Sequence, residues 1–300
     1  MKNYYEIVEE NKFKSGLVVA GFIAFVSAAA YFISYAIGAD SSALVIALIF
    51  STLTSIGSYY YSDKIILSMS GARPATRNEF FDFYTVTENL SKVAQIPTPK
   101  LYVIDDTAMN AFATGRDPEH AVVCATTGLL SRLNRSEIEG VVAHELSHVK
   151  HYDIRLMGII SVLVGSITLL ADWLLRANMF GGRKKEEGNG NLDAIIFVVG
   201  LVLVILSPII AQLIQLAVSR RREFFADAGA VALSKNPEGL VSALEKITGD
   251  KEPLEAANKA TAHLYIANPL KNHHDSIGWF ASLFNTHPPV KDRIKALRGF

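Results

Sequence analysis

The stretch HELSHVKHYD, which begins at His144, carries residues whose types and spacing suit the binding of a metal ion. His144 and His148 are four residues apart, so on a helix both imidazoles project from one face and can bind one Zn²⁺ ion. Glu145 lies between them, where its carboxylate can hold a metal-bound water and take its proton. The spacing therefore predicts a catalytic zinc site. A polar, solvent-facing helix is the alternative, because HExxH also occurs by chance.

A second segment, SRRREFFADAGAVAL, supplies acidic residues that could complete such a site. Two histidines and one carboxylate leave a fourth zinc position open for water, which distinguishes a catalytic from a structural zinc site. We expect Glu223 to be the third ligand of one Zn²⁺ per chain, rather than a salt-bridge partner of a neighbouring arginine. Asp227, one helical turn further on, is expected to accept the free ring N–H of a liganding histidine. His151 is the competing candidate for the third ligand, since it follows His148 by three residues.

The elements that must position these residues are predicted from the pattern upstream of the motif. Residues 79–96 have a helical pattern, and three short β-prone segments follow, LYVID, AFATG and AVVCA, which predict a small sheet. The motif forms the second half of a helix that begins at about Ser136, because Ser136 and Glu139 have the spacing of a capping box. We expect Asp153, after this helix, to pair with Arg155 or with a basic end of an apolar run.

Half of the 300 residues are hydrophobic, and the mean hydropathy of +0.25 is high for a soluble protein of this length. The apolar residues are concentrated in four runs, at 16–38, 43–61, 156–175 and 194–218, each long enough for a helix that crosses a bilayer core. A cleaved signal peptide is the alternative for the first run, but this run is longer than a signal core and follows a charged segment. Asp172 makes the third run the weakest predicted span.

These runs divide the chain into an N-terminal transmembrane hairpin (1–61), a first catalytic part (62–155), a second hairpin (156–217) and a second catalytic part (218–300). Lysines and arginines near the span ends favour the cytoplasmic side for both catalytic parts, although the loop between the last two spans is also basic. We therefore expect a mainly α multi-pass protein of the plasma (inner) membrane, in contact with the lipid bilayer. It should have about four transmembrane helices and a cytoplasmic, zincin-like α+β catalytic domain with a small β-sheet.

Charge and composition exclude several other classes of partner. The 29 basic residues balance the 29 acidic residues, so net charge gives no support for a nucleic-acid partner. The chain has no GxxxxGK[ST] motif, so we expect no nucleotide to bind and power unfolding, and substrates should already be unfolded or flexible. A single cysteine, Cys124, excludes an internal disulfide and a CxxC site.

Taken together, NAFATG, HELSHVKHYD, SRRREFFAD and NTHPP occur in the order found in a known family. With its two hairpins, the chain resembles the HtpX-like membrane metalloproteases, which are relatives of the CaaX prenyl proteases and of other gluzincins. The resemblance covers nearly the whole chain. It implies a zinc-dependent metalloendopeptidase that removes unfolded or damaged membrane proteins without ATP, as part of protein quality control and the stress response.

The resemblance also implies residues that contact the substrate. In this family NAFATG resembles the edge strand beside the cleft, which would hold a substrate as an added β-strand through Asn110, Ala111, Phe112, Ala113 and Thr114. Asn110 could equally be a turn residue before the strand. His287, in NTHPP, is expected to contact the substrate or stabilise the oxyanion, and a structural role is the alternative.

Two other functions fit parts of the pattern. A narrow processing peptidase of the CaaX type is one, but those relatives have more spans around a large chamber. A non-catalytic zinc-binding membrane scaffold is the other, and Glu145 argues against it because a structural site needs no base there. A transporter is disfavoured, since its expected intramembrane charges are missing apart from Asp172.

Overall fold

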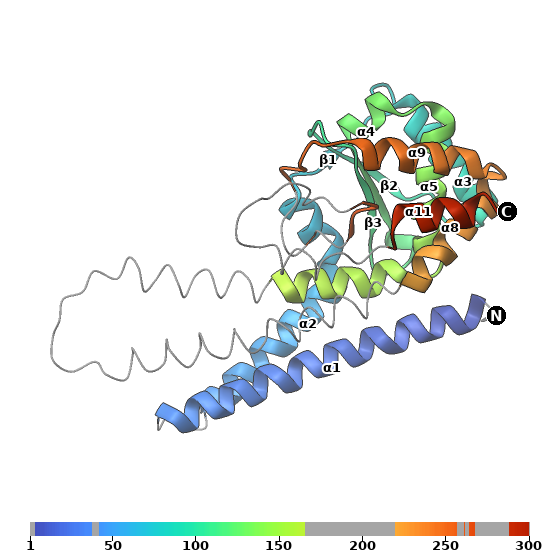
Figure 1. The fold of residues 1–300 in the computed structure, drawn as a ribbon. Coiled ribbons are helices and arrows are strands. Elements are labelled where there is room, and N and C mark those ends of the chain that lie inside the picture. The colour runs from blue at the N-terminus through green and yellow to red at the C-terminus, as the bar shows by residue number, and fades with distance from the viewer. Residues whose placement is uncertain are drawn as a thin grey trace.

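Two long helices and a mixed α+β part make up the described chain (Figure 1). The computed structural model describes residues 4–37, 42–165, 220–256, 261, 264–267 and 288–299. The helices are α1 (Tyr4–Ile37), α2 (Ser42–Met69), α3 (Phe81–Ala94), α4 (Thr127–Arg132), α5 (Arg135–Lys150), α8 (Arg220–Ser234), α9 (Pro237–Gly249) and α11 (Val290–Leu297), together with the helical residues 153–165 and a short 3-10 turn, Pro118–His120.

A four-stranded mixed sheet lies at the centre of the α+β part. Its strands are β1 (Arg73–Pro74), β2 (Lys100–Ile104), β3 (Ala111–Thr114) and β4 (Val122–Thr126), in the order β1-β2-β4-β3. β2 and β4 are parallel, whereas β1 and β3 pair antiparallel with their neighbours. The three predicted strands are confirmed, and β3 is an edge strand. The two residues of β1 were not predicted, because they carry no β pattern and owe their strand geometry to pairing with β2.

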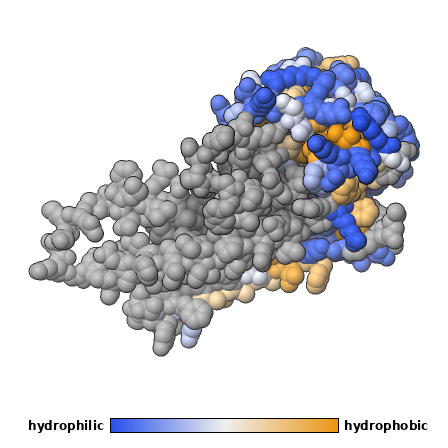
Figure 2. Space-filling model, viewed as in Figure 1, coloured by the Kyte–Doolittle hydropathy of each residue, from blue (hydrophilic) through white to orange (hydrophobic). Residues whose placement is uncertain are grey.

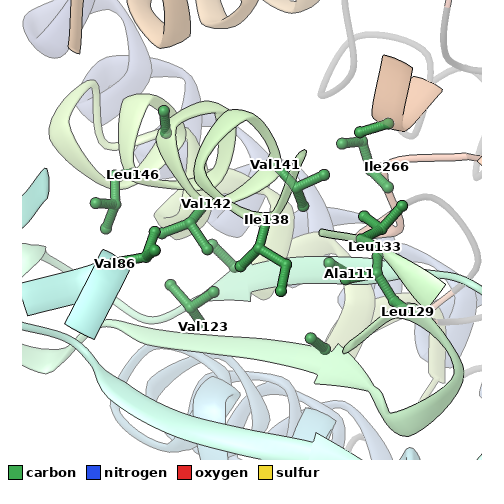
Figure 3. Packing of buried hydrophobic residues seen from close by; sticks show 14 of the residues in the cluster. Val86, Ala111, Val123, Leu129, Leu133, Ile138, Val141, Val142, Leu146 and Ile266 are labelled. Atoms are coloured by element: carbon green, nitrogen blue, oxygen red, sulfur yellow. The ribbon is translucent and has the colours of Figure 1, made fainter. Parts of the chain in front are cut away.

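Both faces of the sheet are covered, which explains why every residue of β4 is buried. Side chains alternate across a strand, so Val123 and Ala125 face one core while Val122 and Cys124 face another. The first core lies under α3 and α5, where Ile138 and Val142 pack towards the sheet (Figure 3). The second core includes Ile66 and Leu67 of α2 together with Leu156 and Ile160. The sheet therefore joins the motif helix on one side to the long helices on the other.

The motif helix α5 begins earlier than predicted. The capping box is formed by Asn134 and Glu137: the Asn134 side chain accepts the Glu137 N–H at 3.0 Å, and the Glu137 carboxylate accepts the Asn134 N–H at 2.8 Å. The prediction of Ser136 and Glu139 was wrong by two positions. Both pairs satisfy the capping pattern, but the Ser136 hydroxyl instead accepts a hydrogen bond from the Asn236 amide at 2.8 Å.

A turn separates α5 from the helical residues 153–165. The helix stops at Lys150, and Tyr152 adopts a left-handed conformation with φ of 61°. A new helix begins at Asp153. The turn changes the chain direction, and this brings the side chain of Asp153 back towards the end of α5.

The predicted membrane spans are described only in part. Residues 16–37 of the first apolar run lie within α1 and the second run lies within α2, which passes the expected boundary at residue 61 without a break. The third run is described to residue 165, so Asp172 and the fourth run lie outside the described residues. Among the helices that are described, none meets the length and hydropathy requirements of a membrane span. The spans stay a prediction from the sequence.

The capping box provides a test of how α5 is held. Burial works to raise the pKa of Glu137, but hydrogen bonds from Lys246, Ser242 and the Asn134 backbone outweigh burial and lower the pKa below 4.5. The stability that the Glu137 carboxylate provides is therefore fully present above this ordinary pKa value. It is lost as the pH falls through the lower pKa that Glu137 has in the folded protein. We expect Glu137→Gln to lower the free energy of unfolding by about 1 kcal/mol near neutral pH.

Thermal unfolding at about pH 7 and about pH 4 measures this effect. The difference between wild type and Glu137→Gln should shrink at the lower pH. Glu139→Gln, on the same helix but partly exposed, is the control and should change little at either pH. A deficit of Glu137→Gln that is the same at both pH values would contradict the assignment.

Candidate metal centre

Three side chains from α5 and α8 converge at one buried point. The Nε2 atoms of His144 and His148 are 3.2 Å apart, and the Glu223 carboxylate lies 3.8 Å from the first and 3.5 Å from the second. All three side chains are buried. α5 and α8 can approach this closely because Gly229 of α8 faces the Ser147 side chain, where an added Cβ would lie 2.2 Å from the Ser147 hydroxyl. The predicted ligand set is thus brought together by the packing of these two helices.

The donor atoms fit a zinc ion. Zinc bonds to nitrogen and oxygen are about 2.0–2.1 Å long, so tetrahedral donors lie roughly 3.3 Å apart. The observed separations of 3.2, 3.5 and 3.8 Å are close to this value. Two imidazoles and one carboxylate also form the donor set that zinc prefers when a fourth position is left open. The residues present therefore fit the metal that the sequence predicted.

Each imidazole is oriented by an aspartate behind it. Nδ1 of His144 lies 3.0 Å from Asp227, and Nδ1 of His148 lies 3.0 Å from Asp153. A carboxylate at Nδ1 keeps the proton there, which leaves the Nε2 lone pair of each ring pointing at the metal position. The contact of Asp227 is the one expected from the sequence.

The contact between Asp153 and His148 was not predicted. We expected Asp153 to pair with Arg155 or a basic end of an apolar run, and it does lie 3.5 Å from Arg222 at the start of α8. Arg155 instead donates a hydrogen bond to the Arg116 carbonyl at 2.6 Å. The amide of Asn11 donates to Asp153 at 2.8 Å, so α1 also contributes to this group.

The two imidazoles differ in basicity. Burial lowers the pKa of His144 to about 4, and the nearby charge of Arg293 adds to that effect. Burial acts in the same direction on His148, but the hydrogen bond to Asp153 and the charges of Glu223 and Asp153 outweigh it and raise the pKa of His148 to about 9. At neutral pH a metal ion must therefore displace a proton from His148.

Arg293 of α11 is a site residue that the sequence analysis missed. It is fully buried, and its guanidinium donates two hydrogen bonds to Asp227, at 2.6 and 2.9 Å. The same group lies 3.7 Å from Glu223 and 3.4 Å from Nδ1 of His144. The sequence does contain a signal for this residue. The apolar face of α11 carries Arg293 together with Val290 and Leu297, and a charged residue on such a face needs a buried partner.

Glu145 is buried beside the two histidines. It lines a cavity of about 10 Å³ together with His144, His148, Ala113 and Ile266, among others. That volume is close to the space that one water molecule requires. His151, the competing ligand candidate, points elsewhere, since its Nδ1 lies 2.7 Å from the Ser147 carbonyl oxygen.

The predicted substrate strand is partly engaged within the protein. The Asn110 amide donates to the Ala267 carbonyl at 3.1 Å, which favours its structural role, and the Ala111 carbonyl accepts the Ile266 N–H at 3.0 Å. Phe112 packs edge-on against Tyr265 in the second core. In β3 the backbone N–H and C=O of Ala113 point away from β4, as those of Ala111 do. Ala113 also lines the cavity.

Thr114, another predicted substrate contact, is not among the residues that line this cavity. Thr114 is buried, and its hydroxyl has no hydrogen-bond partner within the described ranges. His287 lies outside the described residues. Among the described candidates, Ala113 is therefore the residue of this strand that lines the same cavity as Glu145.

Comparison with known proteins identifies similar chains. The sequence model of Peptidase family M48 matches residues 79–300. A protein named Protease HtpX homolog from Dictyoglomus turgidum is 44% identical over 299 residues, which cover 98% of this chain and 94% of the relative. A protein of the same name from Caldanaerobacter subterraneus is 40% identical over 300 residues, which cover 99% of this chain and 98% of the relative. The resemblance stated from the motifs is confirmed.

A solved structure, that of Ste24p from S. mikatae, matches with a TM-score of 0.50 and 20% sequence identity. The match covers 97% of this chain, which spans 66% of the length of Ste24p. At this identity the comparison concerns the fold alone. The arrangement of helices around a small mixed sheet is shared.

The contact between Asp153 and His148 can be tested through metal affinity. Asp153→Asn removes the charge that holds the Nδ1 proton of His148, and changes of this kind typically weaken zinc binding by about 10–100-fold. Competition of the purified protein with a zinc chelator measures the affinity. Asp292→Asn makes the same chemical change at an exposed position of α11 and should bind zinc as wild type does. Equal affinities for Asp153→Asn and wild type would contradict the role of this contact.

Proposed function

The chain belongs to peptidase family M48, and we propose that it is a membrane-embedded zinc endopeptidase that hydrolyses peptide bonds by an activated water. One observation carries this proposal. Two histidines and a glutamate meet at zinc-binding distances, and the carboxylate of Glu145 lines the water-sized cavity beside them. A closed structural site would have a fourth protein ligand and no need of a base there.

Each side chain has a distinct task in this reaction. His144, His148 and Glu223 would hold the zinc ion, which would polarise the substrate carbonyl and lower the pKa of a water. Glu145 accepts the proton of the attacking water and passes it to the leaving amine. Arg293 fixes Asp227, which in turn fixes the ring of His144, so the ligands keep their orientation through the reaction.

The substrate is proposed to bind as an extended segment along the outer edge of β3. Main-chain pairing to an edge strand depends little on side chains, and this suits an enzyme that cleaves many unfolded sequences. The carbonyl of Ala111 already accepts a hydrogen bond from the N–H of Ile266. The backbone groups of β3 proposed to pair with a peptide are therefore those of Ala113, next to the cavity. A segment that remains folded could not present its backbone there.

Location and biological role complete the proposal. The four apolar runs are proposed to cross the plasma (inner) membrane, with the catalytic parts at 62–155 and 218–300 facing the cytoplasm. After a short turn the motif helix is followed by the third run, and α8 begins just after the fourth. Zinc would therefore lie near the membrane surface, within reach of damaged membrane-protein segments, in agreement with a role in quality control.

Cleavage of unfolded casein tests the enzymatic part of the proposal. Glu145→Gln removes the base but none of the metal ligands, so we expect cleavage to fall by at least about 10²-fold while zinc stays bound. Glu139→Gln, six residues earlier on α5, should retain both activity and zinc. Removal of zinc with a chelator should abolish cleavage by the wild type, and added zinc should restore it.

The outcomes separate the candidate functions. Zinc near one per chain in all three proteins, with cleavage in wild type and Glu139→Gln alone, supports the peptidase and its base. Cleavage by Glu145→Gln at the wild-type rate would contradict the role of Glu145. Zinc without cleavage of casein by any of them would contradict a broad endopeptidase and favour a narrow processing enzyme.

A further inference from the structure

A groove lies between α1, α2 and the helical residues 153–165, away from the metal centre. Its volume is about 330 Å³, and much of its wall is apolar, with Val19, Ile23, Ile56 and Ile159 among the lining residues. Hydrophobic side chains also lie along the edge of the molecule formed by α1, whereas the surface of the α+β part is mostly hydrophilic (Figure 2). The groove thus opens in the region proposed to enter the bilayer.

One end of this groove is basic and aromatic. Lys12 and Arg155 line it together with Tyr59 and Tyr60. The Lys12 ammonium lies 4.7 Å from the ring centre of Tyr152, and the Arg155 guanidinium lies 5.4 Å from that of Tyr59. Within residues 4–37, 42–165 and the other described ranges, neither cation forms an ion pair with a carboxylate. The basic end therefore carries positive charge that no acidic side chain of the described chain neutralises.

A polar group inside the groove also lacks a partner. Ser55 lines the wall, its side chain is 2% exposed, and its hydroxyl makes no hydrogen bond to any of the described residues. A buried hydroxyl without a partner costs about 1–3 kcal/mol, so a bound group with an acceptor oxygen would be favoured there. This acceptor would have to lie between the basic end and the apolar wall.

We propose that this groove binds one anionic glycerophospholipid. The phosphate would lie at Lys12 and Arg155, an ester oxygen would accept from Ser55, and an acyl chain would follow the apolar wall past Val19 and Ile56. This inference rests on the membrane location in the proposed function. Tyrosines at the level of the headgroups agree with the usual position of aromatic residues at a membrane interface.

A peptide occupant fits the groove less well. The walls are helices, whose backbone groups are already hydrogen-bonded internally, so an extended peptide would find no main-chain partners there. A lipid chain needs none. The basic end also favours an anionic headgroup over a zwitterionic one, because the quaternary ammonium of the latter would lie near two cations.

Native mass spectrometry of the full chain in detergent tests the proposal. The protein is offered equimolar phosphatidylglycerol and phosphatidylcholine with identical acyl chains. We expect the wild type to retain more phosphatidylglycerol, and Lys12→Ala to reduce that preference about fivefold. Lys14→Ala is the matched control, since Lys14 lies on the same helix but pairs with Glu10 at 2.6 Å. Its preference should equal that of the wild type.

A second pair of variants tests the apolar wall without changing charge. Gly16 lines the groove and an added Cβ there meets no atom within 4 Å, so Gly16→Phe can fill the space without disturbing the helix. It should lower the retention of both lipids. Gly21 has equally open surroundings on α1 but does not line the groove, and Gly21→Phe should retain lipid as wild type does.

Three results would overturn the lipid site: equal retention of the two lipids by the wild type, equal effects of Lys12→Ala and Lys14→Ala, or equal effects of the two phenylalanine variants. Displacement of the lipid by an equal concentration of glycerol phosphate would also overturn it, in favour of a free phosphate site. Casein cleavage by the same samples is measured in parallel. Cleavage without lipid preference leaves the peptidase intact, whereas lipid preference without cleavage contradicts the peptidase and not the lipid site.

Discussion

Buried charge is the constraint on which the whole centre depends. Four carboxylates, those of Glu145, Asp153, Glu223 and Asp227, are at most 3% exposed, and the guanidinium groups of Arg222 and Arg293 are buried among them. These carboxylates also raise the pKa of His148 to about 9, so its imidazole carries a further positive charge at neutral pH when no metal is bound. A divalent cation held by His144, His148 and Glu223 would replace the proton of His148 with two positive charges. The donor geometry and the acidic surroundings thus both favour a divalent cation.

The same constraint connects distant parts of the chain. Asp227 needs Arg293 from the last described helix, and Asp153 is hydrogen-bonded by Asn11 from the first. The sheet, covered on both faces, keeps α5 in place on one side and the end of α2 on the other. Metal ligands from two helices are therefore oriented by residues from the two ends of the described chain.

Much of this centre was predictable because its signals are local in sequence. The spacing of His144 and His148 fixes their common helix face, and Glu223 with Asp227 gives the same kind of signal on α8. The β segments were recognised from their residue types. Arg293 was missed, because its role comes from tertiary contact with Asp227 and its sequence neighbours give only the weak signal of a cation on an apolar face. The partners of Asp153 and the true cap of α5 depend in the same way on contacts between elements.

X-ray absorption at the zinc edge of the purified protein tests the central claim most directly. The account predicts two imidazole nitrogens at about 2.0–2.1 Å with oxygen donors completing four-fold coordination. In His148→Ala the signal of the second imidazole should disappear, or zinc should be lost. Sulfur ligands, three or more imidazoles, or a spectrum that is unchanged in His148→Ala would contradict a zinc site built from these three residues.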